Sequence, residues 1–555
     1  MQTAPIRPAA ALALALCAAL AAPARAQQDV IEHRVVPGDT LEALSVHYLA
    51  TPRLWPRLQA INHVADPRLL MPGTVLRIPA SLLPAAQASA VFVSGQAQVL
   101  LPGAGQARPL QPGDDLPEGT RLQVADDGFV SVRLVDGTII RVKADADLQL
   151  QQLRRQGRAG SARSVLQLGR GSVESTVAPS EGGARHFEIR TPAASTSVRG
   201  TRFGVALTGA GQTLATVTEG EVAVQAAAPA PTLLPAGQGM QVQADGRSGA
   251  PRPLLAAPDL SALPATVGDA DFVRLPLPAQ AGAVAWQVEL ARDADFTQIV
   301  RSATVQGPQA LLASVDDGSY HLAVRAVDAE QLPGLPAQRR LTVKAHPLPP
   351  LYQSPAPQAV LERGTGQLVC TPVVGSVRYR IQVAAGADFA APLLDQVSDG
   401  DCQAGVSALA PGRYQWRAAS IRSAQGQDDQ GPFAPPQAFT LAERPAAPDL
   451  QALALDHQDA QTQLHWSGQS GQHYRLQLAA AADFAAILAD DTLAEPRWTA
   501  PQLPLGRYYV RLQVSDDASG LVSDFSTPRQ LRLGTGLQTG DGQPVNASDG
   551  SPWAR

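Results

Sequence analysis

The side chains that could do chemistry in this chain are spread thinly and show no catalytic spacing. Three of the nine histidines, His33, His47 and His63, fall within one short segment, but their spacing matches no standard metal site. We expect each of them at the surface. Acidic pairs such as Asp126-Asp127 stand in turn sequences, where aspartate caps the backbone. The sequence predicts no catalytic residue, no metal and no cofactor, although carboxylates of separate domains could still meet in space.

Cysteine chemistry is limited to three residues. Cys17 lies in an apolar N-terminal segment, whereas Cys370 and Cys402 fall within one predicted domain. In an oxidising compartment these two would close a loop with a disulfide worth about 3 kcal/mol. The alternative is two unpaired thiols, one of them buried.

The most informative segment for a binding function is 33–79. Arg34–Val36 has the pattern of a short strand, and Pro37–Thr40 has that of a turn. A helix is expected after this turn, because Asp39 or Thr40 can accept a hydrogen bond from the free amides of its first turn.

A second helix is expected at 54–62. Trp55, Leu58 and Ile61 are spaced to share its buried face. A closing strand at 75–78 completes a small strand–helix–helix–strand unit.

This unit, at residues 30–80, resembles a LysM domain. The matching residues are Gly38-Asp39-Thr40-Leu41, Trp55-Pro56-Arg57-Leu58, Asn62 and Pro72-Gly73-Thr74-Val75-Leu76-Arg77-Ile78-Pro79. LysM domains bind polymers that contain N-acetylglucosamine, in bacteria usually peptidoglycan. The resemblance therefore implies peptidoglycan as a partner.

The resemblance also implies recognition in a shallow groove. Backbone groups of Gly38, Asp39, Thr40 and Leu41 would bond the acetamido group and hydroxyls of the sugar. The loop from Asn62 to Pro72 would form the other side of the groove. The expected apolar floor consists of Leu41, Leu70 and Met71. A single module should bind weakly, so avidity would need oligomers or further contacts.

The whole chain predicts a multidomain, mainly β protein. Its 555 residues exceed the roughly 250 that one core usually serves, and glycine and proline are plentiful at 47 each. Short runs rich in Val, Thr and Leu dominate after residue 63. A formal net charge of -5 provides no electrostatic footprint for nucleic acid and no basic stripe for an anionic membrane.

The N-terminus has the pattern of a secretory signal. Arg7 is followed by the apolar run 9–22, and Ala24-Arg25-Ala26 is a small-x-small cleavage site. We expect residues 1–26 to be removed and the mature chain to be periplasmic. A lipid anchor on Cys17 is the weaker alternative, because Leu16 precedes it where a small residue is needed. No other stretch reaches the roughly 18 apolar residues that span a bilayer.

Residues 91–228 predict an all-β domain, preceded by a linker at 80–90. Asp-Gly turns separate alternating runs, which is a strong hairpin signal. The predicted strands are 121–124, 129–134, 138–142, 164–168, 171–177, 186–190, 201–207, 214–218 and 221–225.

This domain resembles the FecR type. The matching segments are Gly113–Leu122, Thr191–Phe203 and Val217–Val224. In the namesake systems the protein is a sensor that reaches a sigma factor through a transmembrane helix. Since the mature sequence shows no such helix, the resemblance does not carry that role over. Within the motif, Arg199 and Gly200 are expected to have structural roles.

Three repeats fill the remainder, at 258–345, 350–442 and 446–533. Trp286 to Phe296 aligns with Tyr379 to Phe389 and Tyr474 to Phe484, and Gly-x-Tyr recurs at Tyr320, Tyr414 and Tyr508. A period near 90 residues with β patterning is typical of fibronectin type III-like or immunoglobulin-like sandwiches. Their aromatic residues are expected in cores, and the tail 534–555 is expected to be disordered.

These observations favour a non-enzymatic, exported scaffold. The LysM-like unit would hold it on peptidoglycan, and the β domains would bind an unknown envelope protein. Two alternatives stay open: a periplasmic sensing component that uses the FecR-like domain, and a cell-wall enzyme with an unrecognised site.

Overall fold

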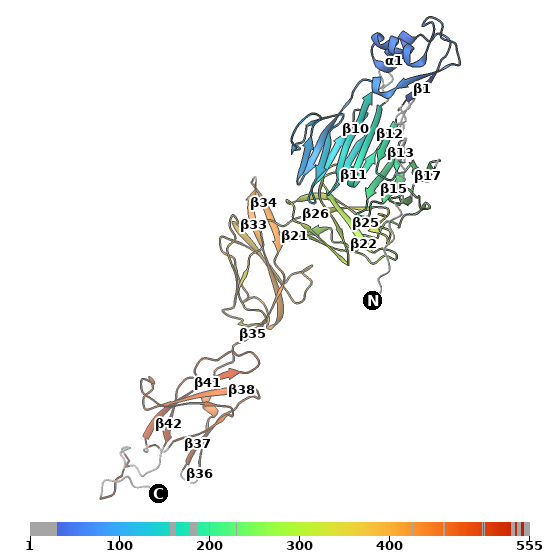
Figure 1. Ribbon diagram of the computed structural model, residues 1–555. Coiled ribbons are helices and arrows are strands. Elements are labelled where there is room, and N and C mark those ends of the chain that lie inside the picture. Colours follow the sequence, from blue (N-terminus) through green and yellow to red (C-terminus); the bar gives the residue numbers. More distant parts are fainter. Residues whose placement is uncertain are drawn as a thin grey trace, which may run out of the picture. The chain divides into compact units, whose positions relative to one another are not determined.

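The computed structural model describes residues 30–155, 162–177, 186–198, 200–228, 230–424, 426–458, 461–501, 503, 506–533, 539–540 and 545–548. Strands dominate, and both described α-helices lie near the start of the described chain (Figure 1). The prediction of a multidomain, mainly β chain is confirmed. The predicted signal segment, Cys17, Arg199 and most of the tail lie outside the described residues.

The N-terminal unit packs two short helices on a two-stranded antiparallel sheet. Its elements are β1 (Val30–Arg34), α1 (Leu41–Leu49), the 3-10 turn η1 (Pro52–Leu54), α2 (Trp55–Asn62) and β2 (Val75–Pro79). Leu44, Leu58, Leu76 and Ile78 lie in its core. Two details of the prediction are wrong. The first strand ends at Arg34, and Ile61 is 42% exposed because α2 turns Trp55 and Leu58, but not Ile61, toward the core.

The central domain follows without a linker. Its strands are β3 (Gln87–Ser94), β4 (Ala97–Leu100), β5 (Arg108–Pro109), β6 (Asp115–Pro117), β7 (Arg121–Val124), β8 (Phe129–Arg133), β9 (Ile139–Val142), β10 (Asp147–Arg155), β11 (Ala162–Thr176), β12 (His186–Arg190), β13 (Ser195–Val198), β14 (Arg202–Leu207), β15 (Thr213–Glu219), β16 (Glu221–Gln225), β17 (Thr232–Pro235), β18 (Gln238–Val242) and β19 (Arg252–Pro253). They extend beyond the predicted bounds of 91–228.

The expected linker at 80–90 is therefore wrong. Ala80–Leu82 forms the 3-10 turn η2, and the amide of Ala86 donates to the carbonyl of Leu153 at 2.9 Å. Ala80 and Leu83 are buried in the core of the N-terminal unit, and Ala86, Ala88 and Ala90 are buried in the core of the central domain, so the segment belongs to both cores.

Strand β11 joins the two sheets of the central domain. One sheet has the order β5-β4-β7-β10-β11-β12-β13-β16-β17, and the other β6-β3-β8-β9-β11-β14-β15-β18-β19. The sequence predicted two strands here. At Gly171 the strand passes from one sheet to the other with φ +77°, and a Cβ there would meet Ala146 Cα at 2.5 Å, so this position requires glycine.

Each repeat has two sheets. Repeat 1 contains β20 (Thr266–Val267), β21 (Phe272–Pro276), β22 (Ala285–Ala291), β23 (Ile299–Val305), β24 (Gln309–Ala313), β25 (Gly318–Val327) and β26 (Ala337–Val343). Its sheets are β20-β26-β25-β22-β23 and β21-β24. Tyr320, Tyr414 and Tyr508 are all buried, as the repeat pattern predicted.

Repeats 2 and 3 vary the same plan. Repeat 2 contains β27 (Tyr352–Ser354), β28 (Val360–Glu362), β29 (Gln367–Cys370), β30 (Arg378–Ala384), β31 (Leu394–Asp399), β32 (Gln403–Gly405), β33 (Gly412–Ala424), β34 (Gln427–Phe433) and β35 (Gln437–Ala442). Repeat 3 contains the 3-10 turn η3 (Leu450–Ala452), β36 (Ala454–Gln458), β37 (Gln461–His465), β38 (Gln472–Ala479), β39 (Ile487–Leu493), β40 (Arg497–Thr499), β41 (Gly506–Asp516) and β42 (Arg529–Leu533).

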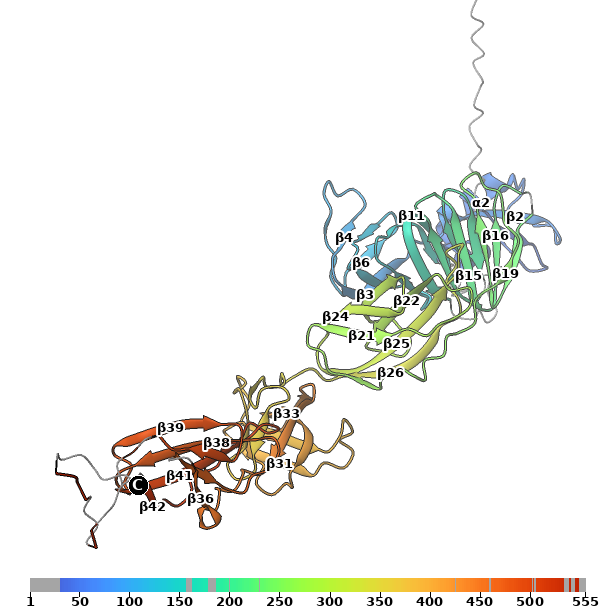
Figure 2. The same cartoon turned by 90° about the horizontal axis from the view of Figure 1, so that it is seen from below.

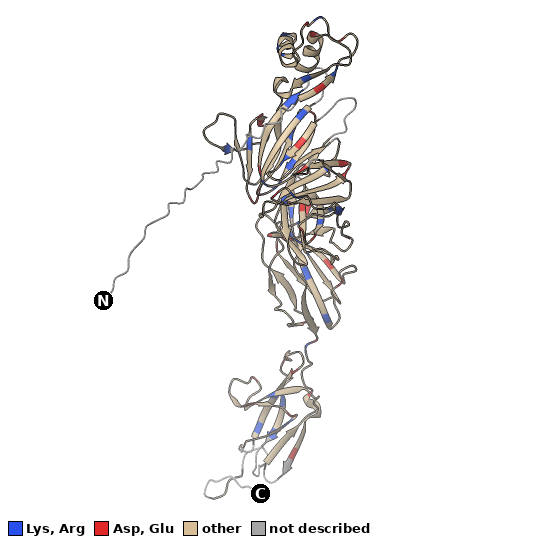
Figure 3. Cartoon of the chain, turned by 45° about the vertical axis from the view of Figure 1, so that its right-hand side comes forward, with Lys and Arg blue, Asp and Glu red and all other residues tan. Residues whose placement is uncertain are grey.

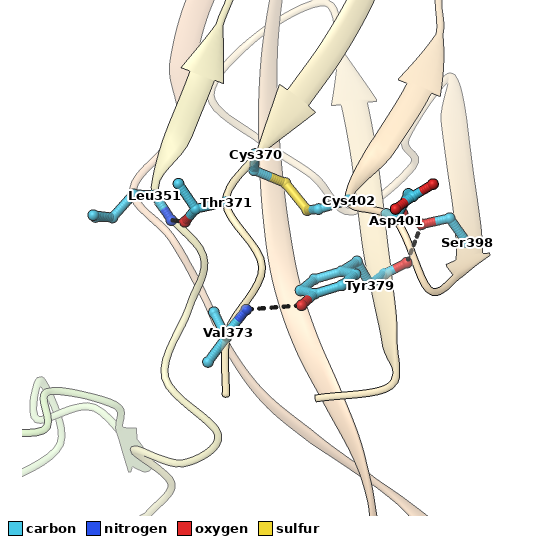
Figure 4. Close-up of a disulfide and its surroundings, with 8 residues drawn as sticks. All are labelled: Leu351, Cys370, Thr371, Val373, Tyr379, Ser398, Asp401 and Cys402. Carbon is cyan, nitrogen blue, oxygen red and sulfur yellow. Dashed lines mark hydrogen bonds between the residues drawn. A yellow bond between two sulfur atoms is a disulfide. The ribbon is translucent and has the colours of Figure 1, made fainter. Parts of the chain in front are cut away.

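A disulfide joins Cys370 to Cys402 within repeat 2 (Figure 4). Their Cα atoms lie 5.1 Å apart, and the amide of Cys370 donates to the carbonyl of Cys402 at 2.9 Å. Both cysteines are buried in the core beside Tyr379. The bridge therefore closes the chain between β29 and β32 across a sequence separation of 32.

Repeat 1 packs against the central domain through a buried charge network. Glu174 of β11 lies 2.5 Å from Lys143 Nζ and 3.4 Å from Arg141 Nη2, and it also pairs with Arg325 of β25. Lys143 reaches Glu289 of β22 at 2.7 Å. Although burial alone would raise the pKa of Glu174, the three cations hold it well below its usual value.

An apolar contact lies beside this network. Phe129 of β8 packs with Phe296 and Ala323 of repeat 1 in one buried cluster. The positions equivalent to Ala323 carry Arg417 and Arg511, whose guanidinium groups lie 4.2 Å from the rings of Phe389 and Phe484. Repeat 1 lacks this arginine, so the ring of Phe296 packs against Phe129 of the central domain instead. Figure 2 shows β22 and β25 beside β3 and β15.

Replacing Glu174 by Gln should remove the negative charge that three buried cations share, and among them only Lys143 keeps a second carboxylate partner within the described residues, Glu289. We expect a loss of about 3–5 kcal/mol in the free energy of unfolding, measured by chemical denaturation. Asp245→Asn, which breaks the exposed Asp245–Arg247 pair, should leave the transition unchanged. Equal effects of the two variants would contradict a structural role for the network.

Replacing Cys370 and Cys402 together by Ala should destabilise repeat 2 by about 3–4 kcal/mol, because the unfolded chain regains the entropy of the open loop. Denaturation curves with and without reductant measure this. The stability of the wild-type protein in reductant should equal that of the variant, and reductant should not change the stability of the variant. A variant as stable as the oxidised protein would contradict the prediction.

Candidate functional site

Two loops of the N-terminal unit lie side by side and form the candidate site. The amide of Gly73 donates to the carbonyl of Val35, and the amide of Val35 donates to the carbonyl of Thr74, both at 2.8 Å. Gly38 and Gly73 turn the two loops at φ +96° and +91°. A Cβ at either glycine would have no atom within 4 Å, so backbone conformation rather than crowding requires glycine here.

Asp39 fixes the first loop. Its Oδ2 accepts from the amide of Val36 and from His33 Nε2, each at 2.8 Å, and His33 Nδ1 lies 2.9 Å from the hydroxyl of Tyr48. Burial alone would raise the pKa of Asp39, but the bonds from His33 and Val36 lower it. His33 is thus half-buried and structural, whereas it was predicted at the surface; His47 and His63 are exposed.

Thr40 caps helix α1. Its hydroxyl accepts from the amide of Ala43 at 3.0 Å, which settles the choice between Asp39 and Thr40. Helix geometry leaves the amides of Leu41 and Glu42 without an intrahelical acceptor. Leu41 is buried as a whole residue, so the amide of exposed Glu42 is the donor that the start of α1 can offer to a ligand.

Leu41 cannot serve as an apolar floor. Its side chain is 1% exposed and lies in the core, since it occupies the first inward-facing position of α1. Leu70 is half-buried against the same core, whereas Met71 is 72% exposed. Leu69 is 71% exposed and was missed by the sequence analysis. Its place in the run Leu69-Leu70-Met71 within a loop was the available signal.

Asn62 does not offer its side chain to a ligand. Its Nδ2 donates to the carbonyls of Leu58 and Arg77 at 2.9 and 2.8 Å, and its Oδ1 accepts from the amide of Arg77. The residue therefore ties the end of α2 to β2. Of the predicted site residues, Gly38, Asp39, Thr40 and Asn62 shape the loops, and Met71 remains as an exposed contact residue.

This arrangement suits a neutral ligand. The loops combine backbone donors with the exposed apolar side chains of Val36, Leu69 and Met71. Acidic and basic residues are interspersed along the molecule in the view of Figure 3. Within the described ranges, no three His, Cys, Asp or Glu residues are placed to hold a metal ion, and no helix is long and apolar enough to cross a membrane.

Two protein families match this chain. The LysM domain family matches residues 33–79, and the FecR protein family matches residues 120–223. The chain carries a LysM domain and a FecR domain. Both matches fall on the segments whose motifs predicted them, and such domains are typical of extracytoplasmic proteins. The FecR domain continues beyond the matched segment into strands β3–β6 and β17–β19.

Solved structures resemble parts of the chain. A putative anti-sigma factor from Parabacteroides distasonis is 21% identical with a TM-score of 0.20, over 24% of this chain and 59% of its own. The FN1-FN3 domains of chicken CNTN1 are 13% identical with a TM-score of 0.23, over 49% of this chain and 97% of theirs. The chicken interferon gamma receptor alpha chain is 12% identical with a TM-score of 0.19, over 34% and 98%. No curated protein matches the chain.

The LysM domain should lose stability in acid through Asp39. Since the folded pKa of Asp39 lies below the unfolded value of about 3.9, its stabilisation is present above that pH and lost as pH falls through the folded pKa. Asp39→Asn should remove this component of the pH dependence, measured by hydrogen exchange of LysM amides between about pH 2 and 5. Asp66→Asn, a change in the second loop, should retain it. An unchanged profile in Asp39→Asn would refute the assignment.

Proposed function

We propose that this protein is an exported, non-enzymatic scaffold that binds peptidoglycan through its LysM domain. The observation that carries the proposal is the LysM match on a unit whose two loops are pinned together and expose apolar side chains. The sugar would lie across these loops, with Leu69 and Met71 against its apolar face. The amide of Glu42, at the exposed start of α1, would donate to an acetamido or hydroxyl oxygen of the sugar.

Side chains within the site act mainly by positioning. Asp39, Thr40 and Asn62 hold the backbone in place, so that little entropy is lost when a glycan binds. A single shallow site gives low affinity, and binding to a polymer would gain strength from several attached copies. The FecR domain and the repeats would then hold an envelope protein in the periplasm near the wall.

A second candidate function is sensing. The FecR match favours it, because the namesake family works in signalling. In this alternative the FecR domain would bind a separate membrane partner. The LysM domain would only hold the protein at the cell wall. Capture of such a partner by the chain lacking a functional LysM site would favour sensing. If the full chain released soluble fragments from purified sacculi, this would instead support the alternative of a cell-wall enzyme.

Sedimentation with purified sacculi tests the wall-binding proposal. Replacing Leu69 and Met71 together by Asp should lower affinity roughly tenfold or more, because two apolar contacts are lost and charge is added. Leu351→Asp makes the same change at a leucine that is 75% exposed in repeat 2, and should sediment like wild type. If the double variant and this control bind sacculi equally well, the LysM loops are not the wall-binding site.

A further inference from the structure

The sulfur atoms of this chain differ sharply in their access to solvent. Within the described residues, sulfur occurs in two methionines and two cysteines: Met71, Met240, Cys370 and Cys402. Met240 is 0% exposed in the core of the FecR domain, and the two cysteines are buried and joined to each other. Met71 is 72% exposed, on the second loop of the LysM domain. In the described part of the chain, an oxidant in solution therefore meets one thioether.

The fold of the second loop keeps the Met71 side chain in solvent. Leu70 packs against the LysM core, and its neighbours Leu69 and Met71 are both exposed. The carbonyl of Met71 accepts from the amide of Thr74 at 3.1 Å, and the amide of Gly73 donates to a carbonyl of the first loop at 2.8 Å. These backbone bonds hold Met71 beside the first loop without covering its side chain.

Oxidation changes the surface that a methionine presents. The lone pair of the thioether sulfur attacks one oxygen of hydrogen peroxide. An S–O bond forms, the O–O bond breaks and, after a proton moves between the two oxygens, water leaves. The sulfur is oxidised by two electrons, and the peroxide is reduced by the same two. The resulting sulfoxide is polar, whereas the thioether is apolar.

A sulfoxide at Met71 would oppose an apolar ligand contact. Its oxygen accepts hydrogen bonds from water, and the apolar face of a sugar ring laid over it would remove those bonds without replacing them. Thiols, which react with peroxide as thiolates, do not compete within the described residues, because Cys370 and Cys402 form a disulfide. Disulfides persist in oxidising compartments, so the same setting that keeps this bridge exposes Met71 to oxidants.

We propose that oxidation of Met71 to its sulfoxide by a peroxide weakens glycan binding by the LysM loops, and that reduction of the sulfoxide restores it. The inference rests on the proposed function, since it requires Met71 to contact the sugar. The LysM core does not use the Met71 side chain, so the oxidised domain stays folded. Met71 is thus a reversible modification site within the binding surface.

Sedimentation with purified sacculi, before and after limited treatment of the full chain with hydrogen peroxide, tests the proposal. Peptide mass spectrometry should show a sulfoxide at Met71 and an unmodified Met240. The treated protein should bind sacculi roughly tenfold more weakly, with unchanged thermal unfolding, because a polar oxygen then lies at an apolar contact. Treatment with methionine sulfoxide reductases for both sulfoxide epimers should restore binding.

Met71→Leu is the matched variant, because it keeps an apolar side chain of similar volume and has no sulfur to oxidise. It should bind sacculi like the untreated wild type, and peroxide should not change its binding. If peroxide weakened the binding of Met71→Leu as much as that of the wild type, another group would be responsible and the proposal would be wrong.

The outcomes separate this inference from the proposed function. If the untreated wild type and the Leu69→Asp, Met71→Asp variant bind sacculi equally, the LysM loops do not bind the wall and both proposals fail. If the untreated wild type binds through these loops and the Met71 sulfoxide binds equally well, only the oxidation proposal is overturned. Oxidation of Met240 as fast as Met71 in the folded protein would also overturn it, because the two sulfurs would then not differ in access.

Discussion

A single buried carboxylate constrains the first half of this molecule. Glu174 lies on the strand shared by both sheets of the FecR domain, and its cations come from β9, the residue after it and β25 of the next domain. Removing such charges from water is costly unless all partners are present together. The FecR domain and repeat 1 therefore pack together as parts of one compact unit.

The LysM domain uses its polar side chains in another way. Asp39, Thr40 and Asn62 are polar residues of its sequence motif, and each is bonded to backbone of its own domain. They hold the backbone of the two loops, and in the proposed function exposed apolar side chains would supply the contact surface. A motif built on such residues identifies the fold strongly. It identifies the contact residues poorly, because those need only be apolar and exposed.

Local patterns could be predicted from the sequence, whereas contacts between distant segments could not. Helix α2, strand β2 and the repeats follow from spacing and turn residues that act over a few positions. Leu41 was misassigned because a motif does not show which way the first helical residue points. The Glu174 network joins residues 151 positions apart in the sequence, and nothing local marks Arg325 as its partner. The contact at Ala323 could have been suspected, because the aligned positions of the other two repeats carry arginine.

The central claim is that glycan recognition lies in the two LysM loops. Hydrogen–deuterium exchange of the whole chain, with and without soluble peptidoglycan fragments, tests its location directly. The account predicts new protection at the amides of residues 36–42 and 65–74. Protection confined to the FecR domain and repeats, with unchanged exchange in both LysM loops, would contradict it.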